Sequence, residues 1–158
     1  MPRKVKPKAQ IGYAKGFRSG LEDKVAAMLD AGGHSYAYEG YRVEYTVPAR
    51  QAKYTPDFPL LKNGIIVETK GRFLAEDRQK HLLIKEQHPN LDIRFVFSNS
   101  KTRISKASQT TYAKWCETHG FQYADKSIPL AWLEEAPTAE RMEALNSLLK
   151  VTKKVSTK

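Results

Sequence analysis

Apolar residues occupy every second position from Tyr41 to Val47, with polar or charged residues between them. A period of two is typical of a strand that buries one face. This segment therefore predicts a half-buried β-strand that ends at Pro48. The preceding residues 35–39 predict a further piece of strand, separated from the first by Gly40.

The segment from Tyr54 to Gly71 predicts a β-hairpin. Asn63-Gly64 favours a two-residue type I′ turn, in which both central residues have positive φ. The β-branched run 65–67 that follows is typical of a strand entering a core. A two-residue turn sets the register of the two strands and pairs Asp57 with Lys70.

Periodicity and capping signals predict two long helices. Ser19 and Gly32 bound the first, and apolar residues recur along one face between them. The second runs from about 75 to 87, has two acidic residues in its first turn, and is expected to bury Leu82 and Leu83. The apolar segment 91–97 then predicts a strand parallel to the end of the hairpin, because a helical crossover joins the two.

Shorter elements complete the pattern. They are a helix at 112–119 ended by Gly120, an edge strand at 121–123, a short helix that begins at Pro129, and an amphipathic helix that contains Met142, Leu145 and Leu149. Helices and strands in this order predict a mixed α/β domain in which helices flank the sheet.

Charge indicates the class of partner. The chain has 158 residues, enough for one domain with a core, and 27 Lys and Arg residues against 17 Asp and Glu. Three basic segments, 1–21, 98–116 and the residues after 143, contain no acid. This distribution favours a polyanionic partner such as nucleic acid. The lone cysteine excludes an internal disulfide, no apolar run is long enough to span a membrane, and a cytoplasmic location is expected.

Candidate chemistry lies on the predicted hairpin. Side chains alternate along a strand, so Asp57, Glu68 and Lys70 share one side and directly opposed side chains lie about 5 Å apart. Mg²⁺ takes carboxylate ligands, and two such ions clamp the attacking and leaving oxygens of a phosphodiester. A lysine beside them can orient the attacking water and offset the developing charge. The pattern favours a nuclease; a solvated strand end with a Glu–Lys ion pair is the alternative.

Spacing alone makes Glu22 a capping residue. Ser19-x-x-Glu22 is a capping box at the start of the first helix, in which the glutamate bonds back to the Ser19 amide.

Four segments carry a family resemblance: FRSGLEDK at 17–24, YTPDF at 54–58, VETKG at 67–71 and the long segment 77–100, with IPLAW at 128–132 in support. Together they resemble the phage endonuclease I family of the PD-(D/E)xK nuclease superfamily. The likeness spans roughly residues 12–133, and no resemblance is found after about residue 134.

The resemblance implies a restriction-endonuclease-like mixed β-sheet flanked by helices. It implies that Asp57, Glu68, Glu22 and the backbone carbonyl of Thr69 bind two Mg²⁺ ions per active site, with Mn²⁺ able to substitute, and that Lys70 lies beside the attacking water. Glu22 would complete the site of the other subunit in an intertwined homodimer that exchanges residues 17–47. The implied reaction is hydrolysis of branched DNA, including four-way (Holliday) junctions, by paired nicks.

Other basic residues are expected to contact DNA. They come from a basic arm at 1–16, from the 17–133 nuclease domain and its loop after residue 97, and are Arg3, Lys4, Lys6, Lys8, Lys15, Arg18, Arg78, Lys80, His81, Lys85, Lys101, Arg103 and Lys106. The C-terminal helix and tail, 134–158, are assigned no role. Two other functions fit this charge pattern: a non-catalytic nucleic-acid-binding module with a nuclease fold, and a nuclease that cuts linear duplex DNA.

Overall fold

The computed structural model describes residues 19–47 and 49–150. The elements in chain order are α2 (Gly20–Ala31), β1 (Tyr41–Val47), β2 (Arg50–Tyr54), β3 (Phe58–Pro59), β4 (Ile65–Lys70), α3 (Ala75–Gln87), β5 (Asp92–Phe97), α4 (Tyr112–His119), β6 (Tyr123–Asp125), α5 (Leu130–Glu134), α6 (Ala139–Asn146) and β7 (Leu149–Lys150). In this part of the chain no helix combines the length and the apolar character needed to cross a bilayer.

The strands form two sheets. The larger has the order β3-β4-β5-β6; β3 is antiparallel to β4, whereas β5 and β6 run parallel to it. The smaller is antiparallel, with β1 between β2 and β7. Helix α3 joins β4 to β5, so the predicted parallel crossover and the mixed α/β class are confirmed.

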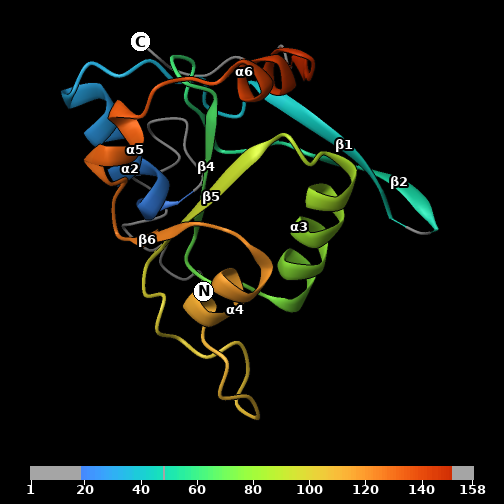
Figure 1. Ribbon diagram of the computed structural model, residues 1–158. Coiled ribbons are helices and arrows are strands. Elements are labelled where there is room, and N and C mark those ends of the chain that lie inside the picture. Colours follow the sequence, from blue (N-terminus) through green and yellow to red (C-terminus); the bar gives the residue numbers. More distant parts are fainter. Residues whose placement is uncertain (1–18, 48, 151–158) are drawn as a thin grey trace, which may run out of the picture.

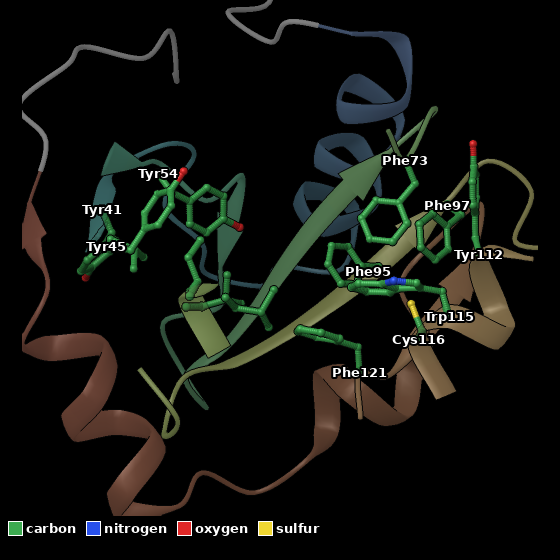
Figure 2. Close-up of a cluster of buried hydrophobic side chains, with 14 of the residues drawn as sticks. Tyr41, Tyr45, Tyr54, Phe73, Phe95, Phe97, Tyr112, Trp115, Cys116 and Phe121 are labelled. Carbon is green, nitrogen blue, oxygen red and sulfur yellow. The ribbon is translucent and has the colours of Figure 1, made fainter. Parts of the chain in front are cut away.

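Alternate residues of β4 enter two different cores. Ile66 packs in an aromatic cluster with side chains of α3, α4, β5 and the β1–β2 hairpin, including Phe95 and Trp115 (Figure 2). Ile65 and Val67 pack in a second cluster with side chains of α2 and α5. Figure 1 shows the same division, with α3 on one side of β4 and β5 and with α2 and α5 on the other. A strand buried on both faces reads as a continuous apolar run, as 65–67 does.

The predicted bounds of the longer helices are confirmed. Ser19 caps α2, where its hydroxyl accepts a hydrogen bond from the Glu22 amide at 3.1 Å, and Gly32 ends the helix. Helices α3 and α4 occupy the predicted residues. Gly120 ends α4 in the left-handed region, at φ 79°, which favours glycine.

Some local predictions are wrong. Residues 35–39 form one isolated bridge, between Tyr36 and Leu60, rather than a strand. The strand β2 was not predicted. Burial alternates in Arg50–Tyr54, but the sequence there is mostly polar. Leu149 lies in β7 and not in the last helix.

The core face of α3 also differs from the prediction. His81 and Ile84 are its buried residues, whereas Leu82 and Leu83 are partly buried at the margin of the cluster.

The hairpin turn is longer than predicted. Phe58 pairs with Val67, and the Leu60 amide donates to the Ile65 carbonyl at 2.7 Å, so residues 61–64 form a four-residue loop. The predicted pairing of Asp57 with Lys70 is therefore wrong by two residues. A shift of two leaves every side chain on its original face, because the side-chain period of a strand is two.

Asn63 explains the longer loop. Among the described non-glycine residues, positive φ occurs at Glu39 and Lys126 only, so Asn63 does not adopt a type I′ conformation. Its side chain is 2% exposed and donates to the carbonyls of Trp132 and Glu135. A residue that signals a turn in the sequence thus anchors the chain around α5.

Candidate active site

Glu68 is a buried carboxylate near the end of β4. It is 4% exposed, and its Oε1 accepts hydrogen bonds from the Tyr54 hydroxyl at 2.5 Å and from the Asp57 amide at 3.1 Å. Both donors belong to the β2–β3 segment, so the pairing of that segment with β4 sets the orientation of Glu68.

Asp57 lies directly before β3 and is equally buried. It is 2% exposed, and its Oδ2 accepts from the Thr69 amide at 3.0 Å and from the Thr69 hydroxyl at 2.9 Å. The predicted convergence of Asp57 and Glu68 is therefore confirmed, and the Thr69 side chain is an additional contact that the sequence did not indicate.

Lys70 lies at the end of β4, two residues after Glu68. Its Nζ lies 3.9 Å from Glu68 Oε2 and 3.1 Å from Oδ1 of Asp77, in the first turn of α3. Asp77 also accepts from the Leu74 amide at the helix start. In the sequence, Asp77 is recognisable only as an acid at the start of a helix; its position three residues beyond Leu74 marks the cap but does not reveal the contact with Lys70.

Helix α2 brings Glu22 to the same place. Glu22 is 5% exposed and accepts from the Tyr38 hydroxyl at 2.6 Å. One oxygen each of Glu22, Glu39 and Asp57 lie within 4.8 Å of one another. Residue 22 also belongs to the helix cap, since the Ser19 hydroxyl accepts from the Glu22 amide. Its carboxylate, however, reaches Asp57.

Glu39 is a site residue that sequence analysis missed. It is 3% exposed, has φ 50°, and its amide donates to the Asp57 carbonyl at 3.0 Å. A non-glycine residue in the left-handed region is uncommon. The available signal was Gly40, which breaks the alternation and marks a bend where strand was expected.

Burial and the charges of neighbouring groups shift the pKa values of the two central carboxylates. Burial raises the pKa of Asp57 well above its usual range, and the negative charges of Glu68 and Glu22 raise it further, whereas the Thr69 hydrogen bonds lower it. Burial also raises the pKa of Glu68, with Lys70 as the largest opposing influence. The negative charges gathered here therefore oppose one another.

These donors fit a divalent ion. Mg²⁺ binds through one or two carboxylates together with water and phosphate oxygens, and its charge would offset the negative charges of the site. Asp57, Glu22 and Glu39 supply oxygens close enough together to share one ion. Glu68 and the Thr69 carbonyl stay predicted ligands.

The expected DNA-contacting residues have different outcomes. Arg3, Lys4, Lys6, Lys8, Lys15 and Arg18 lie outside the described residues. Lys101, Arg103 and Lys106 are exposed on the loop before α4. Arg78 is half-buried and donates to the Phe73 carbonyl, and Lys85 donates to the Gly120 carbonyl. DNA binding by these eleven residues stays a prediction.

His81 does not lie on the surface of α3, as predicted. It is completely buried, with its ring packed against Tyr54 and Phe95, so the expected phosphate contact is wrong for the chain as folded here. The basic residues around it on the helix, Arg78, Lys80 and Lys85, suggested that His81 belongs to a basic surface, but its ring points into the core.

Comparison with known proteins identifies the family. A profile of the phage endonuclease I family matches residues 4–154, and so continues past residue 134, where the sequence suggested no resemblance. Endonuclease I of Escherichia phage T7 is 56% identical over 119 residues, which are 75% of this chain and 79% of that protein. Endodeoxyribonuclease 1 of Enterobacteria phage T3 is 52% identical over 127 residues, 80% of this chain and 83% of that protein. The chain therefore belongs to the phage endonuclease I family of nucleases.

Proposed function

We propose that this nuclease is a Mg²⁺-dependent DNA endonuclease that resolves four-way junctions and other branched DNA by paired nicks, in the cytoplasm of a host cell. The observation that carries the proposal is a series of close contacts near the end of β4, which link Glu22 to Asp57, Asp57 to Glu68 and Glu68 to Lys70. A binding module would not require all four groups. Family membership and the net charge of +10 support DNA as the substrate.

The residues have distinct roles in the proposed hydrolysis. Bound metal would supply positive charge against the phosphate and a more acidic water, with Mn²⁺ able to replace Mg²⁺. Asp57, Glu68 and Glu22 would hold it, and Glu39 is placed to assist. Lys70 would hydrogen-bond the attacking water. Asp77 would keep the Lys70 ammonium in position through their 3.1 Å contact.

The proposal includes an intertwined homodimer built on a restriction-endonuclease-like sheet. Within one chain, β1 pairs with β2 antiparallel, and α2 reaches Asp57 of its own chain. If β1 and β2 instead continued as one strand, Glu22 would make the same contacts with Asp57 of a partner. Exchange of an identical element in this way is a low-cost route to a dimer.

Cleavage assays test the activity. The protein should nick a four-way junction in paired positions with Mg²⁺ present, should cut a linear duplex of matched sequence far more slowly, and should cut neither in EDTA. Equal rates on both substrates would favour the linear-duplex nuclease. Junction binding without any cleavage in Mg²⁺ or Mn²⁺ would favour the non-catalytic module.

Mixed dimers test the exchange. Glu22→Gln and Asp57→Asn chains should each be inactive alone. After co-refolding, an exchanged dimer would place both lesions in one composite site and leave the other intact, so one-sided nicking should return. If mass measurement confirms mixed dimers and no nicking returns, each site is built within one chain and the exchange is refuted.

A further inference from the structure

Lys80 is a second lysine beside the candidate active site, on α3 rather than on β4. It follows Asp77 by three residues, so the two side chains share a face of the helix. Its Nζ lies 5.0 Å from the centre of the Tyr54 ring, and the Tyr54 hydroxyl donates to Glu68 Oε1. Lys80 therefore covers the tyrosine that positions Glu68.

The two lysines are held differently. Lys70 pairs with Asp77 and Glu68, at 3.1 and 3.9 Å. Within residues 19–47 and 49–150, Lys80 forms no ion pair, and its contact is with an aromatic face. An ammonium has three donors, and a ring face satisfies none of them as an oxygen acceptor would.

The surroundings of Lys80 suit an anionic ligand. Lys80 is half-buried, and burial lowers its pKa, with the Lys70 charge adding to the effect. The negative charges of Glu68, Asp77 and Asp57 oppose this shift, which places the ammonium among the charges of the site. A phosphate oxygen would replace the lost hydration with a charge-assisted hydrogen bond.

We propose that Lys80 binds the scissile phosphate of the DNA through a nonbridging oxygen, and that this contact is separate from the role of Lys70 at the attacking water. The inference rests on the proposed function. Negative charge grows on the nonbridging oxygens as water adds to phosphorus, and a fixed ammonium stabilises that charge most when it is shielded from solvent. Lys80 is thus a catalytic residue supplied by α3, rather than one member of a general basic surface.

A pair of matched variants separates these two roles. Lys80→Met keeps the apolar stem over Tyr54 and removes the charge. Lys62→Met removes the same charge from an exposed position in the 61–64 loop, which adjoins the opposite end of β4 from the site. Lys80→Met should slow single-turnover cleavage of a four-way junction about 100-fold, as loss of an oxyanion donor does, and Lys62→Met by less than about threefold.

Metal-free binding locates the contact without relying on activity. In EDTA, Lys80→Met should weaken binding to the junction about tenfold, the scale of a lost hydrogen bond to a charged group. A methylphosphonate at the scissile position, prepared in both stereochemical forms, removes the phosphate charge. With that substrate, parent and variant should bind equally in at least one form. Lys80→Arg keeps the charge and should retain most of the affinity, which guards against loss of folding in the methionine variant.

The outcomes are distinct. If Lys80→Met weakens binding equally with phosphate and with methylphosphonate, the lysine contacts another phosphate and the inference is overturned. If Lys80→Met cleaves as fast as the parent, the inference is also overturned, while the proposed nuclease activity stands. If the parent itself fails to cleave junctions in Mg²⁺, the proposed function fails, and the methylphosphonate comparison still reports whether Lys80 contacts that phosphate.

Discussion

The substitution Asp57→Asn should abolish cleavage and at the same time stabilise the metal-free protein. The asparagine oxygen can accept the same two hydrogen bonds from Thr69, so local geometry is retained. The change removes one negative charge from a buried group of carboxylates. Burial of Asp57 beside Glu68 and Glu22 disfavours its ionised form, and removal of its charge is expected to favour folding.

The distances set the size of the effect. Carboxylate oxygens within 4.8 Å of one another repel by roughly 3.5 kcal/mol per ionised pair at an effective dielectric constant near 20. Proton uptake relieves part of this repulsion, because the pKa of Asp57 is raised. We expect a net gain of about 1–2 kcal/mol in the free energy of unfolding, or about 2–8 °C in Tm for a chain of this length.

The pH dependence has a defined sign. A raised pKa means that the folded state keeps the Asp57 proton to a higher pH than the unfolded state does. Parent and variant should therefore be equally stable well below pH 4, and the advantage of the variant should grow as pH rises above the unfolded pKa.

Thermal unfolding in EDTA, from pH 3.5 to 8, measures the difference directly. Glu86→Gln removes a charge from an exposed position of α3 and serves as control, with an expected change below about 0.5 kcal/mol. Addition of Mg²⁺ should raise the Tm of the parent more than that of Asp57→Asn, since metal binds the folded state of the parent. A metal-free variant that is less stable than the parent at pH 8 would refute the electrostatic argument.

Three further predictions follow from the same structure. Lys70→Arg should lose most single-turnover activity, because a guanidinium does not readily release a proton and places its charge further from the strand. Near-parental rates would show that Lys70 contributes only its positive charge. Arg141 is 7% exposed and donates hydrogen bonds to Asp92, Glu135 and the Asn63 carbonyl, so Arg141→Met should lower the free energy of unfolding in urea by about 2–3 kcal/mol. The loss is smaller than for a fully buried ion pair, because both carboxylates are partly exposed and keep their contacts with Arg94. An unchanged midpoint of unfolding would show that α6 contributes little. Burial lowers the pKa of His81, so the free energy of unfolding should fall as pH drops below about 6.5. His81→Phe should show a weaker fall between pH 7.5 and 5.5, and identical pH profiles of stability for parent and variant would contradict this prediction.

Local sequence patterns determined much of the fold and the central triad. Caps and periodicity placed α2, α3 and α4, because hydrogen bonds between near neighbours define helix ends. Asp57, Glu68 and Lys70 were predicted together even though the register was wrong by two residues, because a shift of two preserves the face of every side chain. Family resemblance, and not spacing, separated the site role of Glu22 from helix capping.

Only the tertiary structure decided which other residues join the site and which leave it. Glu39 enters through a backbone bend, and Asp77 enters because α3 packs its first turn against the end of β4. His81 was assigned to the surface because helical spacing alone does not say which side of α3 meets the sheet. Asn63 carried a strong turn signal, yet its amide serves contacts with Trp132 and Glu135, about seventy residues away. Local pattern specifies conformation over a few residues, whereas burial and partner choice depend on segments that meet only after the chain has folded.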